Sequence, residues 1–132
     1  MEKRLLNPRF ERAERSDILA FQLDKLSALI ERTWHQNAFY RDLWSQQGAR
    51  PVSIDSFETF QSAIPITRKS DLIADQAAMP PYGKRLAAVR SSGQPCIVMN
   101  TSGTSGQGVE LHAMTHAERA RAFEISAYLY RW

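Results

Sequence analysis

The first third of the chain carries hydrophobic residues at the spacing of an amphipathic helix. Its apolar positions are Leu19, Leu23, Leu26 and Ile30. Steps of three and four residues place these side chains on one face, so the pattern predicts a helix that Ser16 caps and that ends near residues 34–35. A second, short helix is predicted around residues 39–44, because Gly48 stands at the C′ position and Pro51 prevents its continuation.

Two further helical segments follow, and each has a recognisable start. Asp55 and Glu58 stand at the spacing of a capping box, which predicts a helix that stops before Pro65. Thr67 is predicted to cap a fourth, short helical turn that runs through residues 71–73.

Beyond residue 79 the pattern changes to turns and short alternating runs. The three strand candidates span residues 86–89, 96–99 and 109–113. Thr115 and Glu118 then form a second capping-box pattern, which predicts a helix through residue 129.

These elements predict an α/β fold, which is α+β within the residues present. A helical segment is predicted at 1–78 and the start of a β-hairpin region at 79–132. Because the last helical pattern runs to Trp132 without a C-cap, we expect the chain to be a piece of a longer protein.

The composition predicts a folded protein and excludes several classes. Of the 132 residues, 43% are hydrophobic, which is enough to form a core. The apolar runs are short, so neither a membrane span nor a signal peptide is predicted. Cys96 is the only cysteine. It therefore forms no intramolecular disulfide, favours a cytoplasmic location, and is expected to be a small buried hydrophobe.

The net charge of +3 is unevenly distributed. Residues 1–75 carry eleven basic and eleven acidic side chains, whereas residues 76–132 carry six basic and three acidic ones. This excess suits an anionic ligand in the second segment. Adjacent basic residues form nothing larger than pairs such as Lys84-Arg85 and Arg68-Lys69, so a nucleic-acid partner is not predicted. The three histidines lack the spacing of metal ligands, and no metal site is predicted.

The strongest candidate for chemistry is the loop Thr-Ser-Gly-Thr-Ser-Gly-Gln-Gly at residues 101–108. Such composition is also typical of flexible linkers, but eight residues between two predicted strands is long for a simple connection. The glycines allow close backbone approach, the hydroxyls donate hydrogen bonds, and no carboxylate in the loop would repel phosphate. A Walker P-loop is excluded, because Gln107-Gly108 stands where Lys-Ser/Thr would be needed. The predicted phosphate ligands are Thr101, Ser102, Gly103, Thr104, Ser105 and Gly106.

Two of these segments, in collinear order, resemble the N-terminal region of phenylacetate–CoA ligase and its relatives in the adenylate-forming superfamily. Residues 64–72 read Ile-Pro-Ile-Thr-Arg-Lys-Ser-Asp-Leu and are similar to that family's Leu-Pro-x-Thr-Thr-Lys-x-Asp-Leu. Residues 101–106 are similar to its phosphate loop, Ser-Ser-Gly-Thr-Thr-Gly. Weaker matches, such as the Ala-Phe-Tyr-Arg of residues 38–41, extend over nearly the whole chain.

The chain departs from the family pattern at three places. Gln107-Gly108 replaces a Lys-Pro pair, and residues 81–83 only loosely match Tyr-Pro-Phe-Gly. Glu110 and His112 interrupt an otherwise aliphatic strand. These departures indicate a divergent member, or one with weakened affinity for ATP.

The resemblance implies ATP-dependent activation of a small carboxylic acid, with Mg²⁺ as cofactor and CoA as co-substrate. The loop would hold the β- and γ-phosphates and stabilise the charge on departing pyrophosphate. No catalytic residue of the family falls within this chain, so the chain is expected to need the missing C-terminal part of the enzyme. A homodimer of the full enzyme is left open.

Two other functions remain open at this point. The chain could be a stand-alone nucleotide- or phosphate-binding module without catalysis. It could also derive from an acyl-protein synthetase, which transfers the acyl group to a protein thiol instead of CoA.

Overall fold

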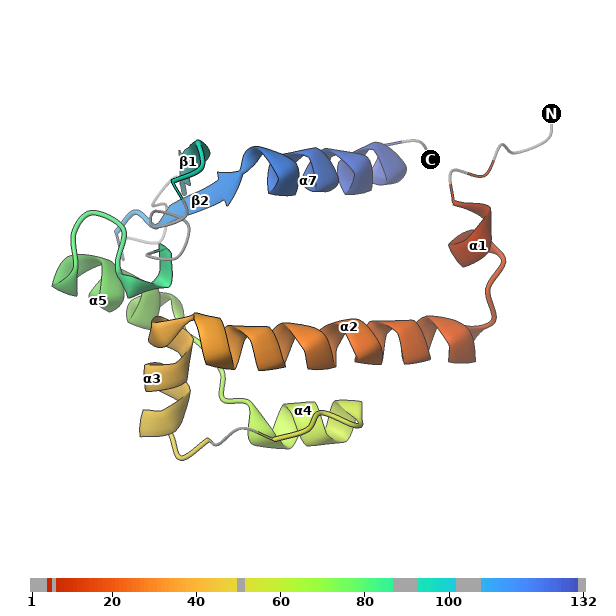
Figure 1. Ribbon diagram of the computed structural model, residues 1–132, viewed down its shortest axis with the longest axis horizontal. Coiled ribbons are helices and arrows are strands. Elements are labelled where there is room, and N and C mark those ends of the chain that lie inside the picture. The colour runs from red at the N-terminus through yellow and green to blue at the C-terminus, as the bar shows by residue number, and fades with distance from the viewer. Residues whose placement is uncertain (1–4, 6, 50–51, 87–92, 102–107, 131–132) are drawn as a thin grey trace.

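A computed structural model describes residue 5 and residues 7–49, 52–86, 93–101 and 108–130. Helices dominate its first part, and a two-stranded antiparallel sheet followed by a helix makes up the second (Figure 1). No helix in the described ranges is long and apolar enough to cross a membrane. The elements are α1 (Pro8–Glu11), α2 (Arg15–Gln36), α3 (Ala38–Gln46), α4 (Phe57–Ala63), α5 (Lys69–Ala78), the 3-10 helix η1 (Lys84–Leu86), β1 (Cys96–Asn100), β2 (Leu111–Thr115) and α7 (His116–Leu129).

The helices α2 and α3 confirm the periodicity, although not every predicted cap. Ser16 does not cap α2, because the helix begins at Arg15 with Glu14 as N-cap and takes Ser16 into its first turn. The Asn37 side chain caps α3 by accepting the Tyr40 N–H at 3.5 Å. After α3, Gly48 adopts φ +83°, the left-handed conformation expected of a C′ glycine.

The caps of α4 and α5 differ from the prediction by one residue each. Ser56, not Asp55, caps α4, since its hydroxyl accepts the Thr59 N–H at 3.0 Å. Asp55 instead accepts the Thr59 hydroxyl at 2.7 Å. Thr67 does not cap α5: the N-cap is Arg68, whose N–H donates to Asp71 Oδ2 at 2.7 Å. In both cases the side-chain oxygen that reaches the free amide decides where the helix begins.

The hydrophobic core lies where α2 and α3 meet the segment that leads into α4. Its buried residues are Ile30, Trp44 and Ile54, and the predicted face of α2 packs against them through Leu23 and Leu26. Trp34 stacks on Trp44 with ring centroids 6.3 Å apart. The indole Nε1 of Trp44 is buried and has no hydrogen-bond partner in the described part of the chain.

The hairpin of β1 and β2 confirms two of the three predicted strands. Cys96 pairs with Thr115 and Asn100 with Leu111. The prediction for residues 86–89 is wrong at Leu86, which is buried at the end of η1; residues 87–89 lie outside the described ranges. The second strand begins two residues later than predicted, at Leu111.

Cys96 is exposed, which contradicts the expectation of a buried thiol. It stands at the start of β1, where four of the five residues are exposed. An apolar run predicts a strand, but the run does not say whether another element covers it.

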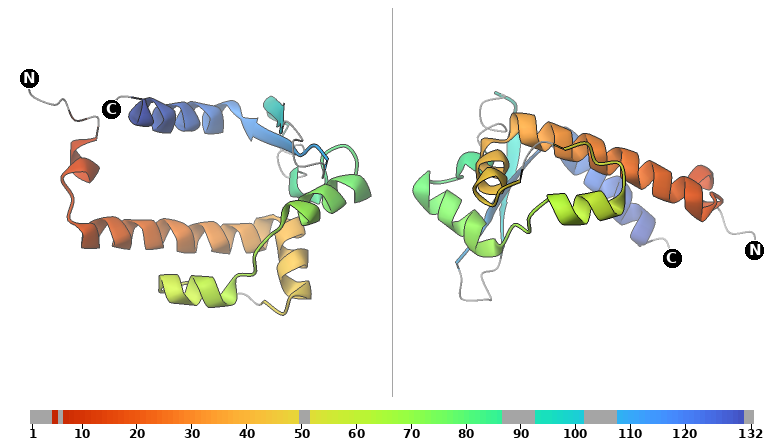
Figure 2. Two further views of the ribbon diagram at one scale, coloured as in Figure 1. Left: turned by 180° about the vertical axis from the view of Figure 1, so that it is seen from behind. Right: turned by 90° about the horizontal axis from the view of Figure 1, so that it is seen from below.

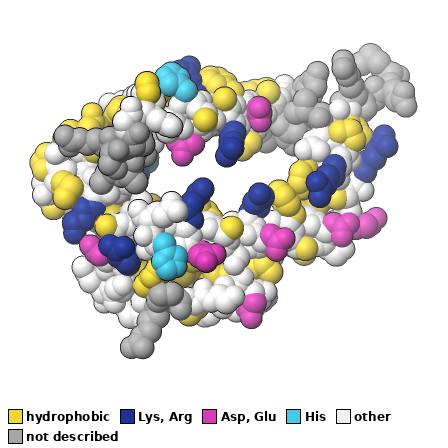
Figure 3. Space-filling view, viewed as in Figure 1, with side chains coloured by type: hydrophobic (Ala, Val, Ile, Leu, Met, Phe, Trp, Pro, Cys, Tyr) yellow, Lys and Arg dark blue, Asp and Glu magenta, His cyan; other side chains and the backbone are white. Residues whose placement is uncertain are grey.

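The last helix, α7, extends from β2 with little packing. Its capping box is confirmed: the Thr115 N–H donates to Glu118 Oε2 at 2.7 Å, and the Glu118 N–H donates to Thr115 Oγ1 at 3.2 Å. Figure 2 shows α7 and α2 extending from the hairpin region toward the same side, and in Figure 3 the space between them stays open. Phe123 and Ile125 are 60% and 65% exposed on α7.

Candidate functional site

The candidate loop leaves β1 and enters β2 through a closed pair of residues, Thr101 and Glu110. The Thr101 N–H donates to the Glu110 carbonyl at 3.0 Å. The Glu110 N–H donates in return to Thr101 Oγ1 at 3.1 Å. This reciprocal pairing continues the register of the hairpin by one step and holds the two ends of the loop together.

Only one of the six predicted phosphate ligands lies within the described residues. Thr101 is at the base of the loop, and its hydroxyl oxygen accepts the Glu110 amide. A threonine hydroxyl that accepts one hydrogen bond still has its own proton to donate. Ser102, Gly103, Thr104, Ser105 and Gly106 lie outside the described ranges, as does Gln107.

Gly108 brings the returning end of the loop against α5. It adopts φ +98°, and a β-carbon at this position would lie 3.6 Å from Ile73 Cδ1. The contact itself would be ordinary, so the conformation is what favours glycine at this position. The predicted role of the loop glycines in permitting unusual backbone geometry is therefore visible at Gly108.

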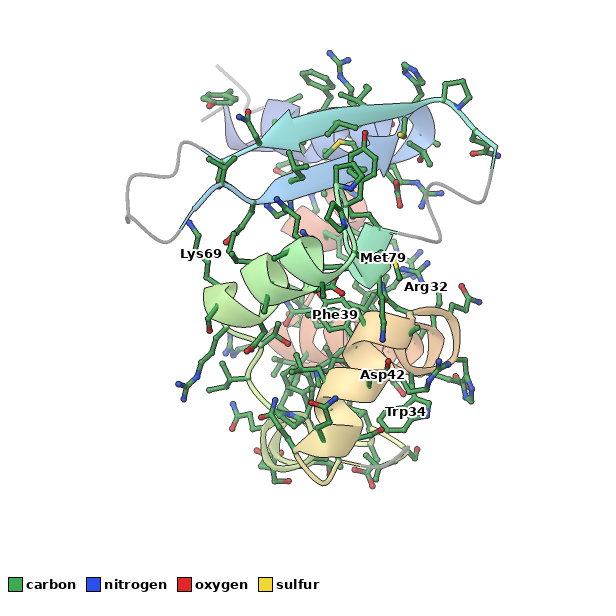
Figure 4. All side chains as sticks on the ribbon, turned by 90° about the vertical axis from the view of Figure 1, so that its left-hand side faces the viewer. Arg32, Trp34, Phe39, Asp42, Lys69 and Met79 are labelled. Carbon is green, nitrogen blue, oxygen red and sulfur yellow. The ribbon has the colours of Figure 1, made fainter. Side chains whose placement is uncertain are left out.

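A charged cluster adjoins the loop at Glu110. Its side chain is only 12% exposed, and Oε1 lies 3.8 Å from the Lys69 Nζ while Oε2 lies 3.2 Å from His112 Nε2. Lys69 belongs to the 64–72 segment, and Figure 4 shows it at the side of the hairpin from which the loop emerges. The tertiary structure thus places Lys69 next to Glu110, whose backbone pairs with Thr101 at the base of the loop.

The outer edge of β2 is held by the side-chain amide of Gln76 on α5. Gln76 Nε2 donates to the Val109 carbonyl at 3.3 Å, and Gln76 Oε1 accepts the Leu111 N–H at 3.0 Å. One amide thus makes the pair of hydrogen bonds that a neighbouring strand would make.

Arg85 holds the same edge from η1. Its NH2 donates to the Leu111 carbonyl at 2.7 Å, and NH1 lies 3.4 Å from His112 Nδ1. The backbone of Arg85 is itself fixed, because its N–H donates to Asp75 and its carbonyl accepts the Asn37 amide. Both outward-facing backbone groups of Leu111, the first residue of β2, are therefore bound by side chains.

Asp75 gives η1 its conformation. Its two carboxylate oxygens accept the N–H groups of Lys84 and Arg85, each at 3.0 Å. The chain reaches this position through Gly83 at φ +72°, where a β-carbon would collide with the Asp75 carboxylate. These two hydrogen bonds hold residues 84–86 in the 3-10 turn that ends at Leu86.

Sequence reasoning missed Gln76 and Arg85. Neither belongs to a motif, and their partners lie 35 and 26 residues further along the chain. Lys69 was present in the 64–72 pattern, but its proximity to Glu110 required the tertiary structure. In the described part of the chain, no three His, Cys, Asp or Glu side chains come together as metal ligands would.

One carboxyl at the far end of β2 has a perturbed pKa. The Thr115 backbone N–H, followed by the Thr115 hydroxyl, lowers the pKa of Glu118 because both donate to its ionised form. Arg32 on α2 and Arg121 act in the same direction. This site caps α7 and is distinct from the loop.

Structural comparison shows that the fold matches the N-terminal region of an adenylate-forming acid–CoA ligase. Neighbours include structures of 2-hydroxyisobutyryl-CoA ligase in several states. Its open conformation in complex with 2-HIB-AMP and CoA has a TM-score of 0.70 and 29% identity, over 84% of this chain and 24% of that one. Its thioesterification state has a TM-score of 0.71 and 31% identity, over 84% of this chain and 23% of that one.

The postadenylation state of the same ligase, in complex with 2-HIB-AMP, gives a TM-score of 0.71 at 29% identity, over 84% of this chain and 22% of that one. The chain thus spans less than a quarter of the length of these neighbours. No family model matches the chain. The search of curated proteins likewise finds no match.

Proposed function

We propose that this chain supplies the phosphate-binding loop of an ATP-dependent acid–CoA ligase that forms an acyl-adenylate. The observation that carries this proposal is the 29–31% identity, over 84% of the chain, to a ligase whose structures hold an adenylate and CoA. The loop at residues 101–106 is the part of the chain best suited to polyphosphate.

The geometry around the loop supports an anionic ligand. Thr101 closes the base of the loop and keeps a hydroxyl proton to donate, and Gly108 allows the backbone to return close to α5. Lys69 and Arg85 stand beside β2, where Lys69 Nζ lies 3.8 Å from Glu110 Oε1 and Arg85 donates to the Leu111 carbonyl. Such a site would bind phosphate through backbone N–H groups and hydroxyls, with these two cations nearby.

The proposed reaction has two steps, as the family resemblance implies. A carboxylate oxygen attacks the α-phosphorus of ATP and pyrophosphate leaves, which gives an acyl-adenylate. The CoA thiol then attacks the acyl carbon and AMP leaves. In the first step, the loop residues of this chain would orient the β- and γ-phosphates and stabilise the charge on pyrophosphate.

Magnesium would enter with ATP. Glu110, the carboxylate beside the loop, is already engaged by Lys69 and His112. A Mg²⁺ ion would therefore take its oxygen ligands from the phosphates and from loop hydroxyls, and would neutralise part of the phosphate charge.

We infer that the substrate is a small carboxylic acid and that the enzyme is related to phenylacetate–CoA ligase. The 64–72 and 101–106 segments support that relationship, and the structural neighbour acts on a small hydroxy acid by its name. The acyl pocket and the catalytic groups would come from the remainder of the longer protein. This chain alone would then bind phosphate weakly and would not catalyse.

Two measurements test the proposal. Calorimetric titration of the 132-residue chain with MgATP should show saturable binding. The protein encoded by the whole reading frame should then catalyse ATP–pyrophosphate exchange that depends on an added carboxylic acid.

Each outcome selects one function. ATP binding without exchange for any acid would indicate a stand-alone nucleotide-binding module. Exchange followed by acyl transfer to a protein thiol, with no CoA thioester, would indicate an acyl-protein synthetase. Absence of ATP binding in both proteins would overturn the proposal.

A further inference from the structure

We propose that Gln76 and Arg85 are positioning residues for the phosphate loop, because together they clamp Leu111 at the point where the loop enters β2. This inference rests on the proposed function of the loop. Neither side chain needs to touch the phosphates. They act through the backbone of residues 109–111, which we call the loop exit.

The first arm of the clamp is the Gln76 amide. It donates to the Val109 carbonyl at 3.3 Å and accepts the Leu111 N–H at 3.0 Å. Two hydrogen bonds from one planar amide fix both the register and the direction of the strand beside it. Because Gln76 is on α5, the loop exit moves with that helix.

The second arm is the Arg85 guanidinium. It donates to the Leu111 carbonyl at 2.7 Å and reaches His112 Nδ1 at 3.4 Å. A charged donor makes a stronger hydrogen bond than a neutral one. With these contacts, the guanidinium is turned toward β2.

Both arms depend on adjacent residues of α5: the first is Gln76 itself, and the second, Arg85, is held by Asp75. Gln76 reaches the strand directly, whereas its neighbour Asp75 binds the N–H groups of Lys84 and Arg85 and so presents Arg85 to the strand. The loop exit is therefore braced twice by one helix, over separate routes. A two-stranded hairpin is only marginally stable by itself, so such bracing decides whether the loop ends stay in place.

The consequence for binding is entropic. Binding fixes backbone N–H groups around the phosphate, and a loop exit that is already held in place removes part of the conformational entropy lost on binding. The Arg85 arm has a charged donor, so its loss is expected to matter more than the loss of a neutral hydrogen bond. We therefore expect loss of the Arg85 arm to weaken pyrophosphate binding about tenfold or more, since 1.4 kcal/mol corresponds to a factor of ten.

The test uses the 132-residue chain and two pairs of variants. Arg85→Gln and Gln76→Leu each remove one arm. Lys84→Gln removes the same charge from the neighbouring residue, whose side chain pairs with Asp42 on the surface. Gln61→Leu makes the same exchange at an exposed position of α4. Inorganic pyrophosphate is the probe, with binding measured by calorimetry and backbone opening by hydrogen exchange of residues 108–115.

Two results together support the proposal. Arg85→Gln and Gln76→Leu should each raise the exchange rate of the loop exit and weaken pyrophosphate binding, while the exchange of α2 and α3 stays unchanged. Lys84→Gln and Gln61→Leu should leave both quantities within about twofold of wild type, a change under 0.5 kcal/mol.

A further variant separates positioning from simple charge. Arg85→Lys keeps the positive charge but cannot reproduce the guanidinium fork. Full pyrophosphate affinity in this variant would overturn the proposal, since it would make Arg85 a source of charge only. An affinity close to that of Arg85→Gln supports it.

The remaining outcomes distinguish this inference from the proposed function. Faster exchange with unchanged affinity would overturn the positioning role and leave Gln76 and Arg85 as structural residues. If the wild-type chain does not bind pyrophosphate, the positioning role fails together with phosphate binding by this chain. The exchange rates then still show whether the clamp exists, because they need no ligand.

Discussion

The Glu110 carbonyl accepts the Thr101 N–H at 3.0 Å, and the Thr101 hydroxyl oxygen accepts the Glu110 N–H at 3.1 Å. This pair closes the mouth of the glycine-rich loop. The hydroxyl of Thr101, predicted as a phosphate donor, thus also has a structural task. The two tasks are compatible because a hydroxyl oxygen can accept one hydrogen bond while its proton donates another.

Thr101→Val is expected to weaken the closure of the loop. The variant keeps the size of the side chain but leaves the Glu110 N–H without its acceptor, at a cost of about 1 kcal/mol. Hydrogen exchange at Glu110 should become faster, and pyrophosphate affinity should fall. Thr101→Ser, which keeps the hydroxyl, should match wild type in both measurements. If Thr101→Val also matched wild type, the role of the Thr101 hydroxyl in closing the loop would be refuted.

Glu110→Gln is expected to strengthen the binding of pyrophosphate. The substitution removes a largely buried negative charge beside Lys69 and keeps the shape of the side chain. We expect an affinity gain of about threefold to tenfold at low salt that shrinks as the salt concentration rises. Lys69→Met should act in the opposite direction. Calorimetry at two salt concentrations checks both, and weaker binding in the Gln variant would contradict the prediction.

Glu118→Gln is expected to destabilise α7 at neutral pH and not at low pH. The folded pKa of Glu118 lies below its ordinary value of 4.5, because the Thr115 amide and hydroxyl donate to the carboxylate. The stabilisation that the ionised Glu118 gives the folded state is therefore fully present above pH 4.5 and is lost as the pH falls through the folded pKa.

The expected loss at pH 7 is about 0.5 kcal/mol, a modest value because the exposed carboxylate is screened by solvent. Urea melts from pH 7 to pH 3 measure it. If the difference in free energy of unfolding between wild type and variant stayed constant from pH 7 to pH 3, the assignment of this stabilisation to the Glu118 carboxylate would be wrong.

Trp44→Ala is expected to remove the cooperative unfolding transition. Among the described residues, Trp44 is one of the three buried side chains of the core cluster, and truncating a buried tryptophan costs about 3 to 5 kcal/mol. Trp44→Phe should cost much less, because it keeps a ring and removes an indole N–H for which the described residues provide no partner. Ile66→Ala, at a position 82% exposed, provides the control. Thermal unfolding followed by circular dichroism tests all three.

The isolated chain is expected to self-associate through α7. Phe123 and Ile125 present apolar side chains to solvent, and exposed apolar patches drive association. Light scattering should show a mass that rises with concentration. Replacing Phe123 and Ile125 by Glu should reduce this rise, and a monodisperse wild-type monomer would contradict the prediction.

The sequence alone determined the elements whose signals are local. The period of Leu23, Leu26 and Ile30 predicted α2 and its buried face, and the spacing of Thr115 and Glu118 predicted the start of α7. The Ser/Gly composition between two apolar runs predicted a hairpin loop. These patterns are readable because each depends on residues within one or two turns of one another.

Only the tertiary structure decided what surrounds the loop. The sequence predicted a strand over residues 86–89, yet Leu86 ends a 3-10 turn in which Asp75 binds the amides of Lys84 and Arg85. Gln76 and Arg85 carry no pattern of their own, and their importance comes from Leu111, a distant residue whose backbone they bind. Hydrogen bonds between side chains and a remote backbone depend on how elements pack, which hydrophobic periodicity does not encode.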